Sequence, residues 1–159
     1  GATAIRVTIG SDVADATAVL FDPALDVALL YAPGLTGTPM RFAAHDPDRG
    51  ELAAALGYAG GGSLVVLPAA ITGSYAATGR DIYGEERVTR QILELRAAVE
   101  PGDSGGPLVL RDGTIGGRVF AESKTDPDVG YALTPTSVSV RIAPALGRTG
   151  AASVGECIR

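Results

Sequence analysis

The stretch that decides the fold is "PGDSGGPLVL", Pro101 to Leu110. Glycines before and after Ser104 allow a sharp backbone bend, and because they lack side chains they let backbone N–H groups approach another molecule closely. The apolar run that follows is typical of a buried β-strand. The pattern therefore predicts a tight turn that presents the Ser104 hydroxyl at the beginning of a strand. A plain Gly-rich β-turn is the alternative.

Ser104 is the candidate nucleophile of this turn. A serine hydroxyl is a poor nucleophile at neutral pH and needs a neighbouring base, almost always a histidine held by a carboxylate. In Ser-His-Asp enzymes the developing oxyanion is bound by the N–H groups of the serine and of the glycine two residues before it. These groups belong here to Ser104 and Gly102, which we expect to form an oxyanion hole. Asp103 either stabilises this loop or is a solvated turn residue.

The composition is that of a soluble globular protein, with 46% hydrophobic and 19% charged residues in a chain of 159. No segment approaches the roughly 18 apolar residues that a transmembrane helix needs. The formal net charge is −5, and the Lys and Arg residues are scattered, so we expect no nucleic acid partner. Cys157 is the only cysteine and cannot build a zinc site alone. We expect neither a metal nor another cofactor.

Short apolar runs between Gly, Pro and Asp residues predict an all-β fold. Three predicted strands precede a segment rich in Pro, Gly and Asp, and six follow it. Six strands can close a small antiparallel barrel, whereas three are too few for a matching one. Apolar residues at positions 138, 142 and 146 predict a short helix within 135–146. The predicted strands are 4–9, 16–21, 27–32, 52–58, 64–72, 88–99, 107–110, 114–120 and 130–133.

These elements divide the chain into four consecutive parts. Residues 1–40 form the C-terminal part of a first β-barrel, which is incomplete, and residues 41–50 form a linker. Residues 51–134 form a complete second barrel of six strands that carries the nucleophile loop. Residues 135–159 form a C-terminal helix and tail.

Three segments, in this order, resemble the chymotrypsin-like or trypsin-fold serine proteases. "DVALL" at 26–30 resembles the segment that carries the triad aspartate, and "LGYAGGG" at 56–62 resembles the opening strand of the second barrel in bacterial stress proteases. "GDSGGPLV" at 102–109 resembles the nucleophile loop. The resemblance implies a trypsin-like double β-barrel and a serine endopeptidase that uses a Ser-His-Asp triad and an acyl-enzyme. It assigns Ser104 and Asp26 to the triad.

A narrower resemblance involves "DIYGEERVTRQILELRAAVEPGDSGGPL" at 81–108 and the tail "GECIR". Both are similar to the actinobacterial membrane-anchored periplasmic proteases that are associated with acid and oxidative stress resistance in mycobacteria. This resemblance implies an extracytoplasmic location and a membrane anchor in an upstream part of the protein. It also implies a disulfide between Cys157 and a cysteine upstream of Gly1. An inert thiol in the tail is the alternative for Cys157.

Two aspartates compete for the triad position. Asp26 directly precedes an apolar strand, so we expect it to be half-buried, where a carboxylate can orient an imidazole. Asp22 is part of an Asp-Pro pair, and we expect it to be a surface turn residue. Asp26 is therefore the better candidate.

The only histidine, His45, does not fit the role of the base. The family order is His, Asp, Ser, whereas His45 follows Asp26 and is flanked by "DPDR", which is typical of a linker. The resemblance places the base a few residues before Gly1, so we expect the chain to be N-terminally truncated and nearly inactive alone. A catalytically silent peptide-binding or regulatory module of the same fold is the alternative. A doubly wound hydrolase is excluded, because its histidine would follow Ser104.

The family geometry also places a pocket for the side chain that precedes the scissile bond. Its floor would be Ala98, beside Val99, and neither is charged. We therefore expect a preference for small or medium apolar residues over Arg and Lys. Phe120 and Ala121 would pair with the substrate backbone and form one wall. The expected partners are a protein or peptide substrate and the missing N-terminal segment, with the membrane reached only through that segment.

Overall fold

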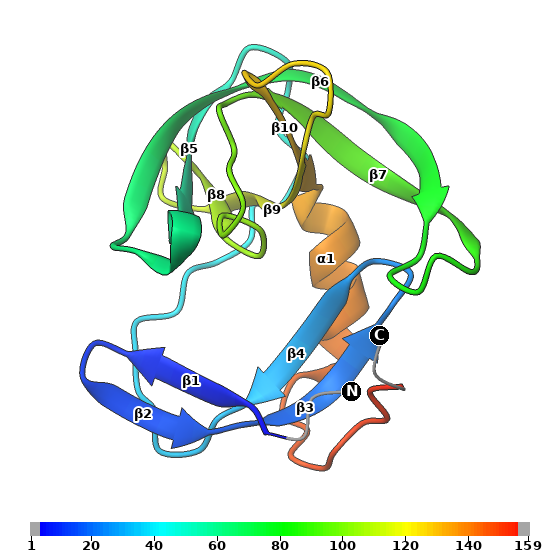
Figure 1. The fold of residues 1–159 in the computed structure, drawn as a ribbon. Coiled ribbons are helices and arrows are strands. Elements are labelled where there is room, and N and C mark those ends of the chain that lie inside the picture. Colours follow the sequence, from blue (N-terminus) through cyan, green and yellow to red (C-terminus); the bar gives the residue numbers. More distant parts are fainter. Residues whose placement is uncertain (1–3, 156–159) are drawn as a thin grey trace. The chain divides into compact units, whose positions relative to one another are not determined.

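The computed structural model describes residues 4–155, which form mostly β-structure (Figure 1). Within this range there are ten strands, one α-helix and two short 3-10 helices. Their bounds, in chain order, are β1 (Arg6–Ile9), β2 (Asp12–Asp15), β3 (Thr17–Asp22), β4 (Val27–Tyr31), β5 (Leu52–Gly57), η1 (Ala59–Gly61), β6 (Val65–Arg80), β7 (Arg87–Arg96), β8 (Pro107–Leu110), β9 (Ile115–Glu122), β10 (Val129–Leu133), α1 (Pro135–Ile142) and η2 (Ala143–Ala145).

The chain divides into two compact units. Unit 1 comprises Gly1–Pro39, Thr78–Val88 and Val140–Arg159, and unit 2 comprises Met40–Ala77 and Thr89–Ser139. Unit 1 thus combines three separate segments, whereas the sequence analysis divided the chain into consecutive ranges. Local patterns along a sequence do not reveal which distant segments pack together.

Unit 2 is built around a closed barrel of six strands in the order β10-β7-β6-β5-β8-β9 (Figure 1). Closure leaves no sheet edge open. Successive side chains of a strand point to opposite faces, and the inward set includes Leu93, Leu95, Leu108 and Val119, all fully buried. The predicted all-β class and six-stranded barrel are therefore confirmed.

The strand β6 is longer than the sequence indicates. It has 16 residues and ends at Arg80, eight residues beyond the predicted end at Thr72. The additional stretch "GSYAATGR" contains two glycines and few strong strand formers. Pairing with the neighbouring strand β7 outweighs this weak local preference.

Unit 1 contains two separate two-stranded sheets, β1-β2 and β3-β4, in the range that the structure describes. Four strands, not the predicted three, precede the segment at 33–50. The missed strand is β2, whose sequence "DVAD" begins and ends with aspartate, a residue that strands usually avoid. It forms because Gly10 turns the chain with a φ of 61° and pairs β2 with β1.

Residues 41–50, predicted to be a linker, are bonded to the barrel of unit 2. The N–H of Ala43 donates to the carbonyl of Ile115 at 2.9 Å. The carboxylate of Asp46 accepts the N–H and the hydroxyl of Thr136 at 3.2 and 2.7 Å. Asp46 therefore holds the first turn of α1 in place.

The helix α1 is the only α-helix among residues 4–155. Pro135 occupies its first position, where a missing N–H has no consequence. The helix ends at Ile142 because Pro144 cannot continue it, and the next three residues form η2. The predicted helix over 135–146 is therefore divided in two. No helix in the described range is long and apolar enough to cross a membrane.

Candidate active site

The predicted nucleophile loop lies between β7 and β8, and backbone hydrogen bonds tie it to β9. The N–H of Gly105 donates to the carbonyl of Val119 at 2.8 Å, and the N–H of Val119 donates to the carbonyl of Gly106 at 2.9 Å. Ser104 is exposed, and its Oγ donates a long hydrogen bond of 3.5 Å to the carbonyl of Phe120. The loop thus presents a serine hydroxyl to solvent beside strand β9.

The glycines of this loop are required by close backbone packing. Gly102 has a φ of 110°, and a Cβ there would lie 2.7 Å from the carbonyl oxygen of Tyr58. A Cβ at Gly106 would lie 1.9 Å from the carbonyl oxygen of Leu56. The N–H of Gly60 also donates to the carbonyl of Pro101 at 3.1 Å. The end of β5 and the η1 turn therefore pack directly against the loop and leave no room for side chains at Gly102 and Gly106.

The two predicted oxyanion donors are free to bind a ligand. No acceptor within residues 4–155 is bonded to the N–H of Gly102 or of Ser104. Both groups are therefore available to donate to a ligand, and two backbone N–H groups that bind the same carbonyl oxygen form an oxyanion hole. Their assignment to that role remains a prediction.

Asp103 stabilises the loop and is not a solvated turn residue. It is only 1% exposed, and its Oδ2 accepts the N–H of Glu100 at 3.0 Å. Its other oxygen, Oδ1, is buried and has no hydrogen-bond partner in the described part of the chain. A Cβ at Gly57 would lie 2.1 Å from this oxygen, so only glycine fits opposite Asp103.

A second polar atom of the described residues is buried without a partner, and it also lies beside the loop. It is Nη1 of Arg118, on β9. A Cβ at Gly105 would lie 3.7 Å from Nη2 of the same guanidinium. A buried unsatisfied polar group costs about 1–3 kcal/mol, and such groups call for a functional explanation. Both unsatisfied atoms therefore belong to residues in or beside the loop that carries Ser104.

The predicted substrate pocket is partly assembled in the structure. Ala98 and Val99 line a pocket of about 520 Å³, whereas Phe120 and Ala121 on β9 are not among the residues that line it. A Cβ at Gly130 would lie 2.4 Å from the Val99 side chain, so this wall is tightly packed. The remaining lining is more polar than expected and consists of Glu100, Glu122, Ser123, Lys124, Thr125, Asp126 and Pro127.

The burial of the two candidate aspartates in unit 1 is opposite to the prediction. Asp26 is exposed rather than half-buried, because it ends the β3–β4 turn and its backbone has a φ of 57°. It is the only non-glycine residue of the described range with a positive φ. Such strain is a reason to suspect a functional position, although aspartate tolerates it better than most residues.

Asp22 is 8% exposed and is not a surface turn residue. It accepts the N–H groups of Ala24 and Leu25 at 2.9 and 3.0 Å, and it forms an ion pair with Arg141. Burial is the largest influence on its pKa and raises it. The hydrogen bonds from Leu25 and Arg141, with the charge of Arg141, outweigh burial, so that the pKa lies below the ordinary 3.8. Asp22 therefore closes the turn as a charged, bonded carboxylate.

The two remaining sequence candidates are His45 and Cys157. His45 is exposed in a bend, and no hydrogen bond or ion pair of the described residues involves its imidazole. Cys157 lies outside the described residues. Within residues 4–155, no group of His, Cys, Asp and Glu side chains is arranged to hold a metal ion.

Comparison with protein families identifies the fold. Residues 2–117 match the model of the trypsin-like peptidase domain. The chain belongs to the trypsin-like peptidase family. The resemblance drawn from the nucleophile loop and its neighbouring segments is therefore confirmed.

Curated relatives of this trypsin-like domain are themselves proteases. The serine proteases Rv3671c and MT3772 of two Mycobacterium tuberculosis strains are each 39% identical over 159 residues, which is 99% of this chain. The chloroplastic protease Do-like 1 of Arabidopsis thaliana is 32% identical over 87% of this chain. The chain spans 40% of the length of the mycobacterial proteases and 33% of the plant protease.

Solved structures agree with this assignment. The active form of the M. tuberculosis Rv3671c protease matches with a TM-score of 0.94 and 39% identity, over 100% of this chain and 70% of that one. Its inactive form matches with a TM-score of 0.82 over 92% of this chain and 75% of that one. A serine endoprotease from Yersinia pestis, at 24% identity, matches in fold with a TM-score of 0.69, over 90% of this chain and 48% of that one.

Three features of the trypsin-like domain escaped the sequence analysis. The η1 turn supports the nucleophile loop, and the glycine cluster at 60–62 was a signal for it, because Gly60 and Gly61 adopt positive φ. The acidic lining of the pocket combines Glu100, Glu122 at the end of β9 and Asp126 in the loop after β9, three residues that no local pattern in the sequence brings together. Burial of the Arg118 Nη1 atom has no local signal, because a charged side chain on a strand is normally exposed.

Proposed function

We propose that this domain is part of a serine endopeptidase in which Ser104 attacks the peptide carbonyl. The observation that carries the proposal is the exposed Ser104 hydroxyl in a loop whose Gly102 and Ser104 N–H groups have no acceptor among residues 4–155. The loop that holds them is fixed by close backbone packing against β5 and η1. A preorganised set of donors of this kind is the main requirement for stabilising an oxyanion.

In the proposed reaction the Ser104 Oγ bonds to the carbonyl carbon as its proton passes to a histidine. The N–H groups of Gly102 and Ser104 bind the oxyanion, and the histidine then protonates the leaving amine, which leaves an acyl-enzyme. Water attacks the ester and restores Ser104. Asp26 would orient the histidine, which the family resemblance assigns to a segment upstream of Gly1. The chain by itself would then hydrolyse peptides only slowly.

The test is the reactivity of Ser104 toward a fluorophosphonate probe. We expect rapid labelling of the full-length protein, slow labelling of the 159-residue chain, and none of the Ser104→Ala variant. Equal slow labelling of both proteins would contradict the triad.

A second candidate is a catalytically silent peptide-binding module. It is supported by one observation: the single histidine of the chain is exposed and has no bonded partner among residues 4–155. The gene decides between the candidates. A histidine encoded shortly before Gly1, in an Ala-His-Val-like setting, supports the protease, and any other residue there supports the module.

The finer identity is also a proposal. The similarity of 81–108 and 155–159 to the mycobacterial acid- and oxidative-stress proteases supports an extracytoplasmic enzyme that is anchored to the membrane by an upstream part. It also supports a disulfide between Cys157 and an upstream cysteine. Thiol titration of the unreduced full-length protein should find no free Cys157, and a reactive thiol there would contradict the disulfide.

A further inference from the structure

The outer face of the β5–β6 hairpin is apolar along its whole length. The two strands are antiparallel, with Leu56 opposite Val66, and inward residues such as Ala55 and Ala69 belong to the buried core. The outward positions of a barrel strand normally carry polar side chains, because they face solvent. Here they are filled by Leu52, Ala54, Leu56, Val66, Pro68 and Ala70.

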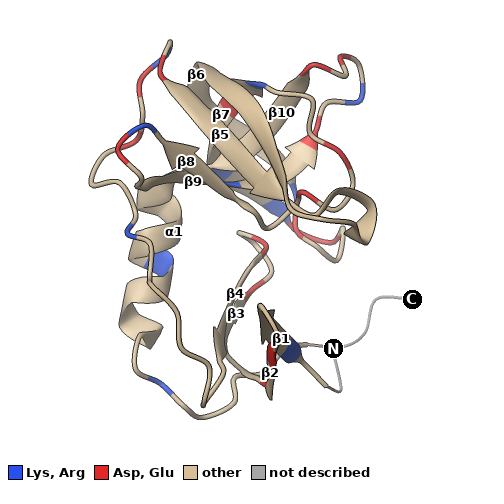
Figure 2. Ribbon diagram, turned by 90° about the vertical axis from the view of Figure 1, so that its left-hand side faces the viewer, with Lys and Arg blue, Asp and Glu red and all other residues tan. Residues whose placement is uncertain are grey.

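Three large side chains of this face are exposed where the hairpin turns. Tyr58 is 57% exposed, Leu64 is 53% exposed and Val66 is 59% exposed. Residues 52–79 contain no charged side chain, so this part of the ribbon is drawn in tan, the colour of uncharged residues, in Figure 2. A contiguous exposed apolar patch without charges is unusual on a soluble domain and marks a binding surface.

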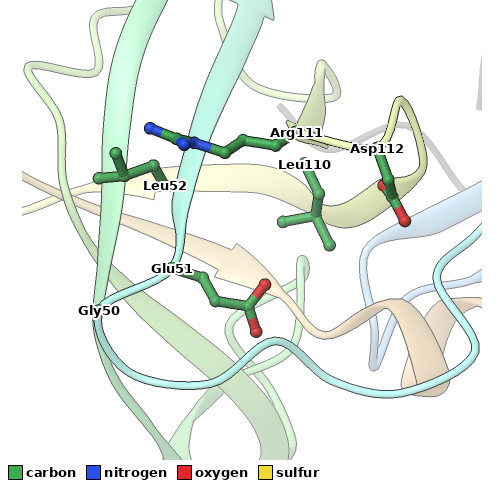
Figure 3. A pocket seen from close by; sticks show the side chains of 6 residues that line it. All are labelled: Gly50, Glu51, Leu52, Leu110, Arg111 and Asp112. Atoms are coloured by element: carbon green, nitrogen blue, oxygen red, sulfur yellow. The ribbon is translucent and has the colours of Figure 1, made fainter.

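The other end of the face is closed by charged residues. Glu51, Arg111 and Asp112 surround a pocket of about 490 Å³ that Leu52 and Leu110 also line. Figure 3 shows the Arg111 side chain extending toward Leu52, with the carboxylates of Glu51 and Asp112 elsewhere around the pocket. The uncharged surface therefore runs from this pocket to the hairpin turn.

The hairpin turn is continuous with the nucleophile loop. The carbonyl oxygen of Tyr58 lies 2.7 Å from the place where a Cβ of Gly102 would be, and Gly60 is hydrogen-bonded to Pro101. On its other side, the loop is bonded to β9, where Phe120 accepts the Ser104 hydroxyl. Ser104 thus lies between strand β9 and the turn that begins at Tyr58.

In this arrangement, the parts of a substrate before and after the scissile bond would contact different surfaces of the domain. In the proposed reaction, the acyl part of the substrate pairs with β9 by strand addition. The leaving part must then continue on the opposite side of Ser104, which is the side of Tyr58. An uncharged apolar surface at this place selects apolar residues and gains nothing from charged ones.

We propose that Tyr58, Leu64 and Val66 determine specificity by binding apolar residues that follow the scissile bond. This inference rests on the proposed protease function. It assigns the substrate class as polypeptides in which an apolar segment follows the cleaved bond, and it assigns the outer face of β5–β6 as the surface that receives that segment.

The test uses the full-length protein and three substrates. Two quenched peptides are identical up to the scissile bond and continue with either Leu-Val-Leu or Ser-Gln-Ser, and the third substrate is a chromogenic amide with nothing beyond that bond. We expect the wild type to cleave the apolar peptide with about tenfold higher kcat/KM than the polar one. Leu64→Ser combined with Val66→Ser should remove most of this preference and leave the amide unchanged.

The matched control is Val13→Ser, because Val13 is 58% exposed on β2 and lies in the other unit. It should leave all three rates unchanged, and thermal unfolding should be the same for every variant because the replaced side chains are more than half exposed. An unchanged preference in the Leu64 and Val66 variant overturns the inference. If neither the amide nor the fluorophosphonate probe reacts with the wild type, the proposed function itself fails.

Two further measurements on the same proteins test whether something other than substrate binds this face. If the wild type sediments as an oligomer and the Leu64 and Val66 variant sediments as a monomer, the face joins copies of the chain and the inference is wrong. If the wild type binds vesicles of neutral phosphatidylcholine and the variant does not, the face binds lipid and the inference is equally wrong. A monomeric wild type that ignores vesicles and prefers the apolar peptide supports it.

Discussion

The carboxylate of Asp22 pairs with the guanidinium of Arg141 across 119 residues of sequence. This pair joins the end of β3 to the end of α1 within unit 1. The Asp22 side chain is only 11% exposed, whereas that of Arg141 is 46% exposed. The carboxylate is therefore the partner that cannot turn to water when the pair is broken.

Replacing Asp22 with asparagine should lower the free energy of unfolding near neutral pH by about 1–3 kcal/mol, because a bond to a charged group is lost. The folded-state pKa of Asp22 lies below 3.8, so its contribution to stability is present above that value and is lost as the pH falls through the folded pKa. Urea unfolding of the wild type and Asp22→Asn should therefore converge at acid pH. The exposed Asp12 provides the control, and Asp12→Asn should leave the free energy of unfolding near neutral pH unchanged.

Asp26→Asn should show the opposite pattern to Asp22→Asn. Asparagine retains the size of Asp26 and its tolerance for a positive φ, and the exposed position makes little contribution to stability. If Asp26 orients the histidine of the full-length protein, kcat should fall by about 10⁴, as in the Ser-His-Asp template. Steady-state kinetics and urea unfolding of Asp26→Asn together distinguish a catalytic role of Asp26 from a role in stability. Full activity in Asp26→Asn, with activity lost in Asp22→Asn, would transfer the role to Asp22.

The sequence was most informative where function depends on local backbone geometry. The glycines around Ser104 predict the sharp turn because their conformational freedom is a property of each residue, and the alternation of apolar residues predicts the barrel strands. The burial of Asp22 depends on Arg141, and that of Asp103 depends on the glycine at position 57. Neither partner is adjacent in sequence, so local patterns did not predict the burial of these two aspartates. They also predicted a half-buried Asp26, which is exposed.

Features that depend on contacts between distant segments could not be predicted from the sequence. Most of the polar lining near Ala98 comes from residues 122–127, and only the folded chain brings them to the pocket beside Glu100. The strand β2 was missed because tertiary pairing with β1 overrides the low strand preference of aspartate. The triad roles of Ser104 and Asp26 remain predictions, since their chemistry depends on a base that this chain does not identify.

Gly57→Ala should inactivate the full-length protein without a change in any reacting group. The added Cβ would lie 2.1 Å from Oδ1 and 2.7 Å from Cα of Asp103, so the loop that carries Ser104 must shift. Misplacing an oxyanion donor costs about 10²–10³ in kcat. The rate of fluorophosphonate labelling measures this directly. Gly150→Ala is the matched control because a Cβ there meets nothing within 4 Å, and equal labelling of both variants would show that the loop tolerates displacement.

Ala98→Asp should change the residue that the full-length protein prefers before the scissile bond. Ala98 is exposed and lines the pocket beside Val99, so an aspartate can be accommodated there without unfolding the barrel. A carboxylate at the floor would pair with a basic side chain that the uncharged floor leaves unpaired. A peptide library should therefore show cleavage after small or medium apolar residues in the wild type, and at least about a tenfold relative gain after Arg and Lys in the variant. Carboxylates that already line the pocket, such as that of Glu122, could instead bind a basic substrate side chain in the wild type. If the wild type already cleaves mainly after Arg or Lys, and Glu122→Gln removes that preference, the lining acids and not the floor set the specificity.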